Sequence, residues 1–475
     1  MARIVIEVPD ECKSLVAPLQ AVVSATARMT KQAAGGRAMP FAQWEQEIGE
    51  AVAAVERESH RAVLQALDID APYVRIWNAL YKQVGRYPST YRTQAGPVEV
   101  ERSLYREVGR RNEKTVDVVS LRSGVVGDGW LPRTARAMSY LLAQGTSREA
   151  ETTSRELGRL PYSRSSFERV GHLVGEFYVD VHRGVEEELR AEMVVPAEAR
   201  SISISIDRVS VPMEEPRSRP VGRPAKDAPK NPCERVYRMA YCATLTLHDR
   251  EGDALHTIRL GRMPQGDVVS LCDSLEAEVQ AALQQKNRLK VMLLADGAPE
   301  LWSLLEERFN QRRLGRDVFR LIDLWHMLEK LGAAARVIHR DTEDADALVR
   351  RWRMRLMNSS KGALRILDEL HDSGCEWLRR GESRPVHDAI TYIENNWERM
   401  DYAAARRRGL PVGSGAVEAT CKSLMAQRLK RNGSRWHEDT GEHVVQLRAV
   451  LLSDRWDSAI RALLDPLATP VRRVA

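Results

Sequence analysis

The stretch that decides the fold is KVMLLADGAP, from Lys290 to Pro299. Five consecutive apolar residues, Val291 to Ala295, are followed at once by Asp296 and Gly297. An apolar run of this length between turn residues predicts a strand that is buried on both faces. Because open α/β sheets usually bind ligands at the carboxyl ends of their strands, Asp296 is a candidate ligand-binding residue. An aspartate that only caps the next helix would give the same pattern, and this alternative stays open.

Two further stretches place a carboxylate in a similar position. SISISIDRVS (201–210) alternates serine and isoleucine as a half-buried strand does, and Asp207 follows the last isoleucine. VGSGAVEATCK (412–422) has turn glycines and then Glu418 near the start of a predicted helix. Two carboxylates at strand ends and one on a helix suit a pair of magnesium ions that hold a phosphodiester and its attacking water. The predicted catalytic and metal-binding residues are therefore Asp207, Asp296 and Glu418.

The composition bounds the class of protein. With 475 residues and 43% hydrophobic content, the chain can bury more than one core, and we expect two or three domains. The excess of 72 Lys and Arg over 66 Asp and Glu is small, so the distribution of charge matters more than its sum. Six scattered cysteines without a CxxC pair disfavour disulfides and a cysteine zinc site. Since no apolar run has the length of a signal peptide core or a membrane span, we expect a cytoplasmic protein without a membrane partner.

The N-terminal third is expected to be a mostly helical DNA-binding region. Residues 1–85 are expected to be helical after a possible strand from Ile4 to Val8, and residues 86–195 are expected to hold a hairpin and a helix-turn-helix-like element. The hairpin turns around Gly96 and Pro97. Its cations either contact phosphates or form a solvated face. They are Arg92, Arg102 and Arg106.

The helix-turn-helix-like element consists of predicted helices at 133–144, 147–157 and 163–177, with GRLP as the last turn. Arg164 and Arg169 lie on the third helix, where a recognition helix carries its DNA contacts. A generic helical hairpin would show the same spacing, so this alternative also stays open.

A proline-rich segment, residues 211–232, interrupts the regular pattern after Asp207. It is either a basic arm that holds DNA in the minor groove or a solvated linker. Its cations are Arg217, Arg219, Arg223, Lys226 and Lys230.

The remaining pattern predicts an α/β fold. Strands at 239–247 and 254–260 follow the strand that carries Asp207, and consecutive strands joined by short turns are antiparallel neighbours by default. Helix, strand, helix and strand follow, ending at Asp323. This is the strand order of a ribonuclease H-like core, with a mixed sheet. The expected ranges are 196–330 for the first part of the core, 331–410 for an all-helical insertion, 411–456 for the end of the core and 457–475 for a tail.

Two other groups of residues are candidates for supporting the metal ligands or contacting DNA. In DLWHMLEKL (323–331), Asp323 and His326 share one helix face and are expected to support a ligand or contact DNA, unless the histidine only packs or caps. Lys422 follows Glu418 by one turn and is expected to bind phosphate. Beyond it, a basic run with an aromatic residue is a candidate DNA contact. This run comprises Arg428, Lys430, Arg431, Arg435 and Trp436.

The tryptophans of the helical insertion allow two interpretations. Trp352, Trp377 and Trp397 are widely spaced, as residues that pack a helical subdomain are. The alternative is that one of them stacks on a flipped or terminal base.

With these stretches together, the chain resembles the DDE transposases of bacterial insertion sequences, most closely their ISKra branch. The matching stretches are SIDRVSVP (205–212), LLADGAPELW (293–302), IDLWHMLEKL (322–331) and GSGAVEATCKSLMAQRLKRNGSRW (413–436). The Asp-x-x-His element is similar to the signature of Mutator-type and hAT transposases, in which a helical insertion precedes the final glutamate. More loosely, YRTQAGPVEVERSLY (91–105) and GDGWLPRTARAMSYLLA (127–143) look like the N-terminal half of the family. The resemblance covers about residues 85 to 456.

The resemblance implies a function and its partners. Magnesium, for which manganese may substitute, would activate water to nick the end of an insertion sequence, and the freed 3′ hydroxyl would attack target DNA. The partners would be terminal inverted repeats and target DNA, held by a homodimer or larger assembly associated with the bacterial nucleoid. Relatives often carry cysteine pairs that look like a zinc ribbon; these are missing here, so we expect no zinc. Another branch has a lysine seven residues after the glutamate, where this chain has Met425.

Competing functions remain. A non-catalytic DNA-binding protein derived from a transposase, or a nuclease of the same fold, would share much of this sequence. All three carboxylates are present, which favours an enzyme. The sequence has no GxxxxGK, HExxH or GxSxG motif, and Ser414 is expected to cap a helix rather than act as a nucleophile.

Overall fold

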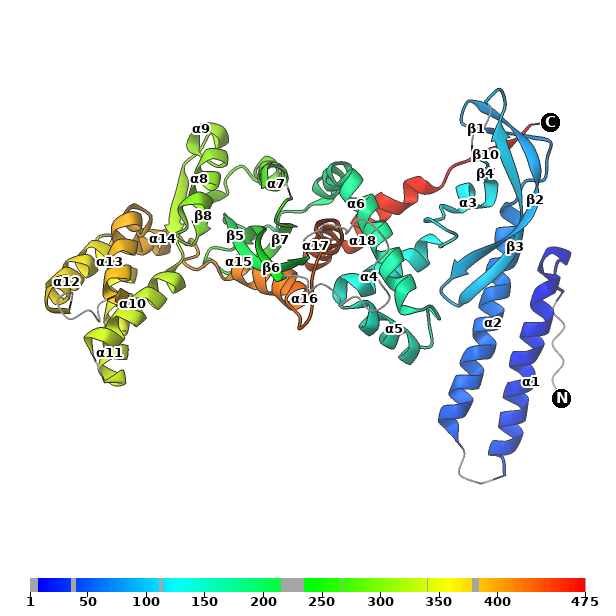
Figure 1. The fold of residues 1–475 in the computed structure, drawn as a ribbon, viewed down its shortest axis with the longest axis horizontal. Coiled ribbons are helices and arrows are strands. Elements are labelled where there is room, and N and C mark those ends of the chain that lie inside the picture. The colour runs from blue at the N-terminus through cyan, green and yellow to red at the C-terminus, as the bar shows by residue number, and fades with distance from the viewer. Residues whose placement is uncertain are drawn as a thin grey trace, which may run out of the picture. The chain divides into compact units, whose positions relative to one another are not determined.

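The computed structural model describes residues 7–35, 40–110, 114–214, 235–266, 268–339, 341–377 and 384–474 (Figure 1). Its internal contacts divide the chain into two units, Met1–Val185 with Asp457–Ala475, and Glu186–Trp456. Each unit holds one five-stranded sheet. No helix among the described residues is both long enough and apolar enough to cross a membrane.

The first unit begins with helices and continues with an antiparallel sheet in the order β10-β1-β2-β3-β4. The hairpin expected around Gly96 is confirmed as β2 and β3, and Gly96 has a φ of 122°, a conformation that favours glycine. The helices and strands up to this point are η1 (Asp10–Leu15), α1 (Val16–Ala33), α2 (Phe41–Leu67), β1 (Tyr73–Ile76), β2 (Ala79–Thr93), β3 (Gly96–Glu107) and β4 (Val116–Asp117).

Residues 1–85 are therefore not helical throughout, which corrects the expectation. β1 alternates exposed and buried side chains, and its tyrosine, valine and isoleucine suit a half-buried strand. The first residues of β2 lie in the same range. The strand expected from Ile4 to Val8 falls mostly outside the described residues.

Four helices follow this sheet: α3 (Val118–Ser123), α4 (Pro132–Gln144), α5 (Ser147–Glu156) and α6 (Arg164–Glu192). The helices expected at 133–144 and 147–157 are confirmed as α4 and α5. A capping box at Thr146, whose side chain and Glu149 satisfy each other's backbone N–H groups, fixes the start of α5. The third helix is longer than expected, because its apolar spacing continues well past residue 177.

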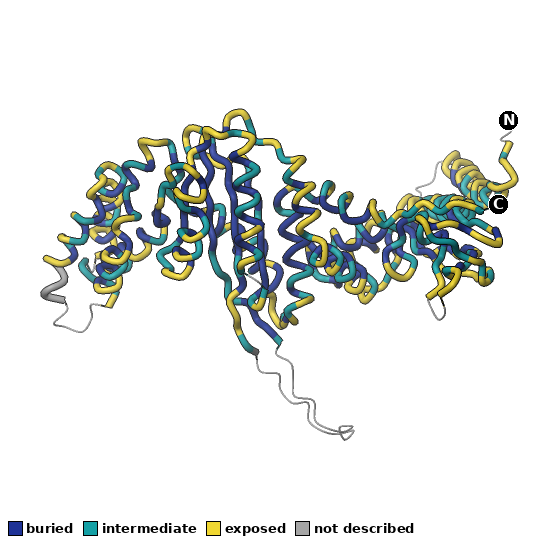
Figure 2. Tube along the Cα trace, turned by 90° about the horizontal axis from the view of Figure 1, so that it is seen from above, coloured by how far each residue is buried: buried dark blue, intermediate teal, exposed yellow. Residues whose placement is uncertain are grey.

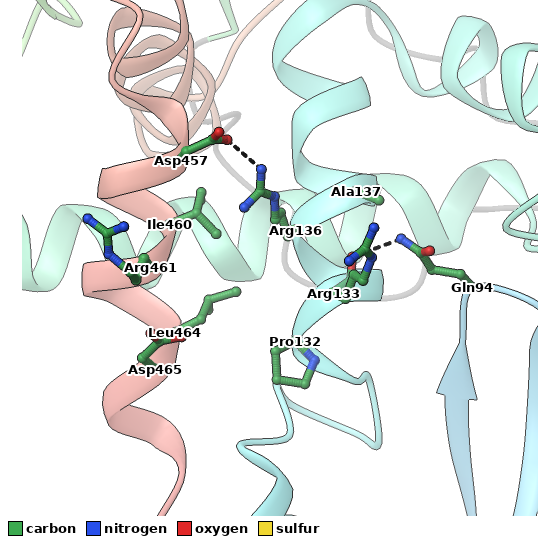
Figure 3. A pocket seen from close by; sticks show the side chains of 10 residues that line it. All are labelled: Gln94, Pro132, Arg133, Arg136, Ala137, Asp457, Ile460, Arg461, Leu464 and Asp465. Atoms are coloured by element: carbon green, nitrogen blue, oxygen red, sulfur yellow. Dashed lines mark hydrogen bonds and ion pairs between the residues drawn. The ribbon is translucent and has the colours of Figure 1, made fainter. Parts of the chain in front are cut away.

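The segment 457–475, expected as a tail, is ordered within the first unit. It contains most of α18 (Trp456–Leu464), then η5 (Asp465–Leu467) and β10 (Val471–Arg473), which pairs antiparallel with β1 (Figure 1). A pocket of about 570 Å³ lies between α4 and α18 (Figure 3). Arg133, Arg136 and Arg461 line it, and Arg136 forms an ion pair with Asp457.

The second unit holds a mixed sheet in the order β7-β6-β5-β8-β9. The first three strands in the chain are antiparallel neighbours, as expected, while β8 pairs parallel with β5 and β9 parallel with β8. β5 and β8 are buried over most of their length, and Figure 2 shows long buried runs through this sheet in dark blue. The strand bounds are β5 (Ser201–Glu214), β6 (Arg235–His248), β7 (Ala254–Arg262), β8 (Lys290–Ala295) and β9 (Val318–Ile322).

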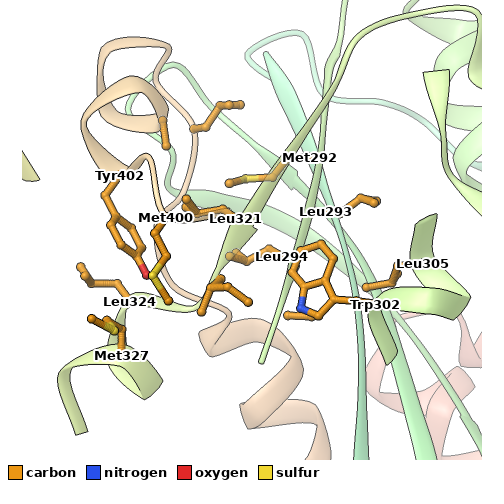
Figure 4. Packing of buried hydrophobic residues seen from close by; sticks show 14 of the residues in the cluster. Met292, Leu293, Leu294, Trp302, Leu305, Leu321, Leu324, Met327, Met400 and Tyr402 are labelled. Carbon is orange, nitrogen blue, oxygen red and sulfur yellow. The ribbon is translucent and has the colours of Figure 1, made fainter. Parts of the chain in front are cut away.

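The apolar core lies on both faces of this sheet because side chains alternate along each strand. On one face, Ile202, Ile204 and Ile206 join the largest cluster. In the same cluster Leu294 lies against Trp302, and Met400 and Tyr402 lie near Leu324 (Figure 4). The helices before β9 are α7 (Val268–Gln285), α8 (Pro299–Arg308) and α9 (Gln311–Leu314).

Between β9 and Glu418 the chain is helical, as expected. Trp352 is fully buried and packs this region, whereas Trp397 is 46% exposed. The side chain of Trp377 lies outside the described residues. The elements are α10 (Leu324–Ile338), α11 (Thr342–Asn358), α12 (Gly362–Trp377), α13 (Arg384–Asn396), η3 (Trp397–Arg399) and α14 (Tyr402–Arg407).

The final helices of this unit cover the other face of the sheet. Val417, Leu424 and Met425 pack there with Val211 and Cys242. The elements are α15 (Gly415–Thr420), a π-helical segment η4 (Cys421–Ala426), α16 (Gln427–Leu429) and α17 (Glu438–Leu452). Since odd-numbered residues of β5 point to this face, Asp207 points toward α15 and η4.

Candidate carboxylate site

Three aspartates lie at the same level on three neighbouring strands. Asp207 comes three residues after Ile204 and Asp296 three residues after Leu293, and Ile204 and Leu293 are the last paired residues of β5 and β8. Asp323 directly follows Ile322, whose partner Ala295 directly precedes Asp296. β8 and β9 are parallel and both end at this level, whereas β5 runs on past Asp207 to Glu214, so Asp207 lies within its strand and not at the strand end expected from the sequence. The fold thus gathers residues from positions 207, 296 and 323 at that level.

Asp296 is held by several donors. Its Oδ1 accepts hydrogen bonds from the backbone N of Gly297, 2.5 Å away, and from the hydroxyl of Tyr392, 3.0 Å away. Its backbone oxygen accepts a hydrogen bond from Nε1 of Trp302 at 2.6 Å. Burial, followed by the charge of Asp296, raises the pKa of Tyr392, so this hydroxyl keeps its proton and donates it.

Gly297 makes the approach of Tyr392 possible. A Cβ at this position would lie 2.5 Å from Cε2 of Tyr392, closer than side chains pack. Tyr392 comes from α13, in the helical insertion. The insertion therefore supplies part of the site.

Asp207 contacts the helical segment that follows Glu418. Sγ of Cys421 donates to Oδ2 of Asp207 over 3.3 Å, and Cys242 lies directly opposite Asp207 on β6. A hydrogen bond with Cys242, burial and the charge of Asp207 together raise the pKa of Cys421. The thiol therefore stays protonated and acts as the donor.

Asp323 caps α10 and links it to the loop before α15. Its Oδ1 accepts from the backbone N atoms of Trp325 at 2.6 Å and His326 at 3.0 Å, and its Oδ2 accepts from the backbone N of Ser414. Asp323 is fully buried. Ser414 occupies the N-cap position of α15, but its side chain forms no capping hydrogen bond, which corrects the expected role. Ser414 thus contributes its backbone N–H, which donates to Asp323, and not its hydroxyl.

Glu418 is the least satisfied carboxylate of the group. Its Oε1 lies 3.3 Å from Nε2 of His326, yet this buried oxygen accepts no hydrogen bond with suitable geometry from any described residue. Burial and the charges of Asp323 and Asp207 raise the pKa of Glu418, although His326 opposes them. A partly buried acidic group with an unsatisfied oxygen is a favourable place for a cation.

His326 experiences the same concentration of negative charge. Burial lowers its pKa, but Asp296, Asp323 and Glu418 outweigh burial, so the net pKa of His326 is raised. One ligand atom each of Asp323, His326 and Glu418 lie within 4.8 Å of one another. This trio shares only Glu418 with the predicted one. Because both oxygens of Asp323 already accept backbone hydrogen bonds, Asp323 is the weakest ligand candidate of the three.

The predicted DNA contacts fall into three groups. Arg428 and Trp436 are buried, with the guanidinium 4.9 Å from the ring centroid, so they pack the core instead of forming a surface. The exposed cations are Lys422, Lys430, Arg431, Arg435, Arg164 and Arg169. Arg217, Arg219, Arg223, Lys226 and Lys230 lie outside the described residues.

Sequence reasoning missed several residues around the carboxylates. Tyr392 and Cys421 were not singled out because each lies in an ordinary helical pattern. Trp325, next to His326, is 53% exposed and has the guanidinium of Arg353 5.5 Å from its ring centroid. A pocket of about 600 Å³ also lies beside Asp296, with Gly297 and Tyr392 in its wall.

Comparisons with known proteins give a limited result. No protein-family model matches the chain, and no curated protein sequence matches it either. Among solved structures, a Mos1 transposase paired-end complex with left transposon end has 14% identity and a TM-score of 0.15, over 58% of this chain and 78% of the other. A pre-cleavage Mos1 transpososome has 12% identity and a TM-score of 0.15, over 84% and 98%. Scores this low carry no argument about function.

Proposed function

We propose that this chain is a metal-dependent transposase of the DDE type, which nicks DNA at the ends of an insertion sequence and joins them to target DNA. The observation that carries the proposal is the common level of Asp207 and Asp296 on adjacent strands, together with the unsatisfied Oε1 of Glu418, whose pKa the charge of Asp207 helps to raise. The antiparallel pairing of β5, β6 and β7 and the parallel pairing of β5, β8 and β9 agree with the strand order expected for a ribonuclease H-like core, and this agreement supports the proposal.

Asp207, Asp296 and Glu418 would hold two magnesium or manganese ions, since carboxylate oxygens are the ligands that these ions prefer. When bound, the ions polarise the scissile phosphate and make the attacking water acidic. Tyr392 and Cys421 orient Asp296 and Asp207 through the hydrogen bonds described above. His326 lies against Glu418 and so limits the positions that this carboxylate adopts.

The reaction has two steps at phosphorus. In the first, water attacks the phosphodiester at the end of the element, the bond to the 3′ oxygen breaks, and a 3′ hydroxyl and a 5′ phosphate result. In the second, this hydroxyl attacks a phosphodiester of the target, a new 3′,5′ bond forms, and a target 3′ hydroxyl leaves.

Exposed cations near the carboxylates supply the DNA contacts in this proposal. Lys422 follows Glu418, and Lys430, Arg431 and Arg435 extend from the same segment. In the first unit, Arg164 and Arg169 are exposed near the start of α6, and the proposal takes this end of α6 as a DNA-contacting helix. Two ends of an element must be held together, so we propose a homodimer or larger assembly on the terminal inverted repeats.

The test uses labelled duplexes that carry the sequences flanking the gene of this protein, with magnesium or manganese. Wild type should nick at the repeat ends, and Asp296→Asn should lower the rate about 100-fold or more, because metal stabilisation is worth several kcal/mol. Asp317→Asn is the matched control, since Asp317 is exposed and precedes the amino end of β9 in the same sheet.

The products distinguish the alternatives. Joined strands in addition to nicks support a transposase, and nicks alone identify a nuclease of the same fold. Tight DNA binding without cleavage in any variant would contradict the enzyme and leave a non-catalytic DNA-binding protein.

A further inference from the structure

Near β10, one face of the first unit's sheet is exposed and places cations directly opposite one another. Arg75 on β1 pairs with Arg472 on β10, and Lys82 on β2 pairs with Arg106 on β3. All four side chains are exposed. The opposite face of these strands packs a small core that includes Val74, Ile76 and Tyr105.

These pairings are costly in the free protein. Like charges directly opposite each other on a sheet destabilise it by up to about 1 kcal/mol per pair, on the scale of cross-strand effects. None of the four cations forms an ion pair with a carboxylate in the described part of the chain. By contrast, the nearby cations Arg86 and Arg102 do pair, with Asp70 and Asp117. These four cations without an ion pair thus lie on the same face.

An exposed aromatic residue lies at the end of the same strands. Trp77, in the turn between β1 and β2, is 74% exposed and has a φ of 53°, a conformation that a bulky residue rarely adopts. Tyr73, also exposed, is the direct partner of Lys82. Aromatic rings among cations are typical of surfaces that bind nucleic acid.

We infer that this face, formed by Arg75, Lys82, Arg106 and Arg472, binds the phosphodiester backbone of duplex DNA. The choice of DNA among polyanions rests on the proposed function, whereas the surface itself is independent of the carboxylates. Phosphates offset the repulsion between the paired cations, which explains why the pairs are tolerated.

The dimensions of the surface suit a duplex. The four cations come from four adjacent strands, so they span about 14 Å across the sheet at about 4.8 Å per strand step. A duplex carries one charge per about 1.7 Å of its axis, so such a face meets several phosphates at once. β10 contributes through Arg472, so the C-terminal strand belongs to this surface.

The experiment measures the affinity of the full chain for a labelled 30-base-pair duplex of arbitrary sequence in EDTA, at several salt concentrations. The variant R75T/R472T removes one pair of cations, and threonine keeps the preference for strands. The matched control is R473T, because Arg473 is exposed on the same edge strand but pairs with Val74 and so belongs to the other face.

For R75T/R472T we expect the slope of log affinity against log salt to fall by about 2, since each lost phosphate contact contributes about 0.9. R473T should change the slope by less than half as much. The double variant should melt no lower than wild type because repulsion is relieved. K82T/R106T provides the same test at the neighbouring strands and decides the matter if the first variant fails to fold.

An unchanged slope in both double variants, or an equal loss in R473T, would overturn the inference. A loss seen only with duplex RNA or with phosphatidylserine vesicles would also overturn it. Because EDTA prevents cleavage, a failure of the proposed catalysis would leave this result unaffected.

Discussion

The two sheets of this protein have five strands each but distribute charge in opposite ways. In the mixed sheet of the second unit, carboxylates collect at the carboxyl ends of β8 and β9 and at the same level within β5. In the antiparallel sheet of the first unit, cations from four strands spread over one exposed face. Parallel strands end together, so residues that follow them converge, whereas antiparallel strands end alternately at opposite edges. Strand direction thus decides whether a sheet builds a site at its edge or a surface on its face.

The largest effect on the nicking rate should come from removing the charge of a carboxylate at the edge of the mixed sheet. Glu418→Gln should lower magnesium-dependent nicking about 100-fold or more, because it removes a metal ligand. DNA affinity in EDTA should stay unchanged, and the melting temperature should not fall, because repulsion from Asp207 and Asp323 is relieved. Nicking assays and thermal melting check this. If Glu418→Gln nicked DNA at the wild-type rate, Glu418 would not be a metal ligand.

A smaller effect is expected from the residue that orients Asp296. Tyr392→Phe removes the hydrogen bond to Oδ1 and should lower the nicking rate about tenfold, as loss of a group that orients a metal ligand does. Tyr402→Phe is the matched control, because the buried hydroxyl of Tyr402 has no hydrogen-bond partner among the described residues. The control should cleave normally and melt slightly higher. Equal losses in both variants would mean that Tyr392 acts only through packing.

The thiol beside Asp207 should have a weaker influence. Cys421→Ala removes one donor, which is worth about 1 kcal/mol or about fivefold in rate. Cys272→Ala creates a similar cavity in the other core cluster and should cost stability without this loss of rate. Single-turnover nicking and thermal melting of the two variants decide between orientation and packing.

The smallest effect concerns the basic face. Lys82→Glu should create an attractive pair with Arg106 and stabilise the free protein by about 0.2–1 kcal/mol. The same substitution should weaken DNA binding. Denaturant unfolding and anisotropy measure the two effects. If Lys82→Glu lowered the free energy of unfolding, repulsion between Lys82 and Arg106 would not be a significant cost in the free protein.

Much of the second unit could be predicted from local sequence. An apolar run followed by Asp296 predicts both a buried strand and a residue at its end, and the strand at 318–322 was located in full. Alternation in SISISI likewise predicts the first half of β5, but the predicted end at Asp207 is wrong, because the strand continues through Pro212 to Glu214. The correctly predicted features are visible because a strand and its terminal residue are contiguous in the chain.

The contacts that complete the site could not be predicted in this way. Tyr392 reaches Asp296 from 96 residues away, and its helix shows only an ordinary amphipathic pattern. Arg428 was expected at a DNA-contacting surface, but the helix passes through the π-helical segment η4, which alters the spacing of side chains, and Arg428 lies buried on Trp436. Such non-local packing depends on the whole fold.

The pairing of β10 with β1 also bears on how the protein is made. Val74 and Arg473 are partners although 399 positions separate them (473 − 74). During synthesis, β1 therefore presents an unpaired backbone edge until the last residues of this strand are added, and open edges promote association between chains. Once β10 pairs, the outermost strand on this side has only three residues and carries the exposed Arg472 and Arg473, and short charged edge strands resist association. Molecules in which β10 is not paired should consequently be the forms most prone to aggregate.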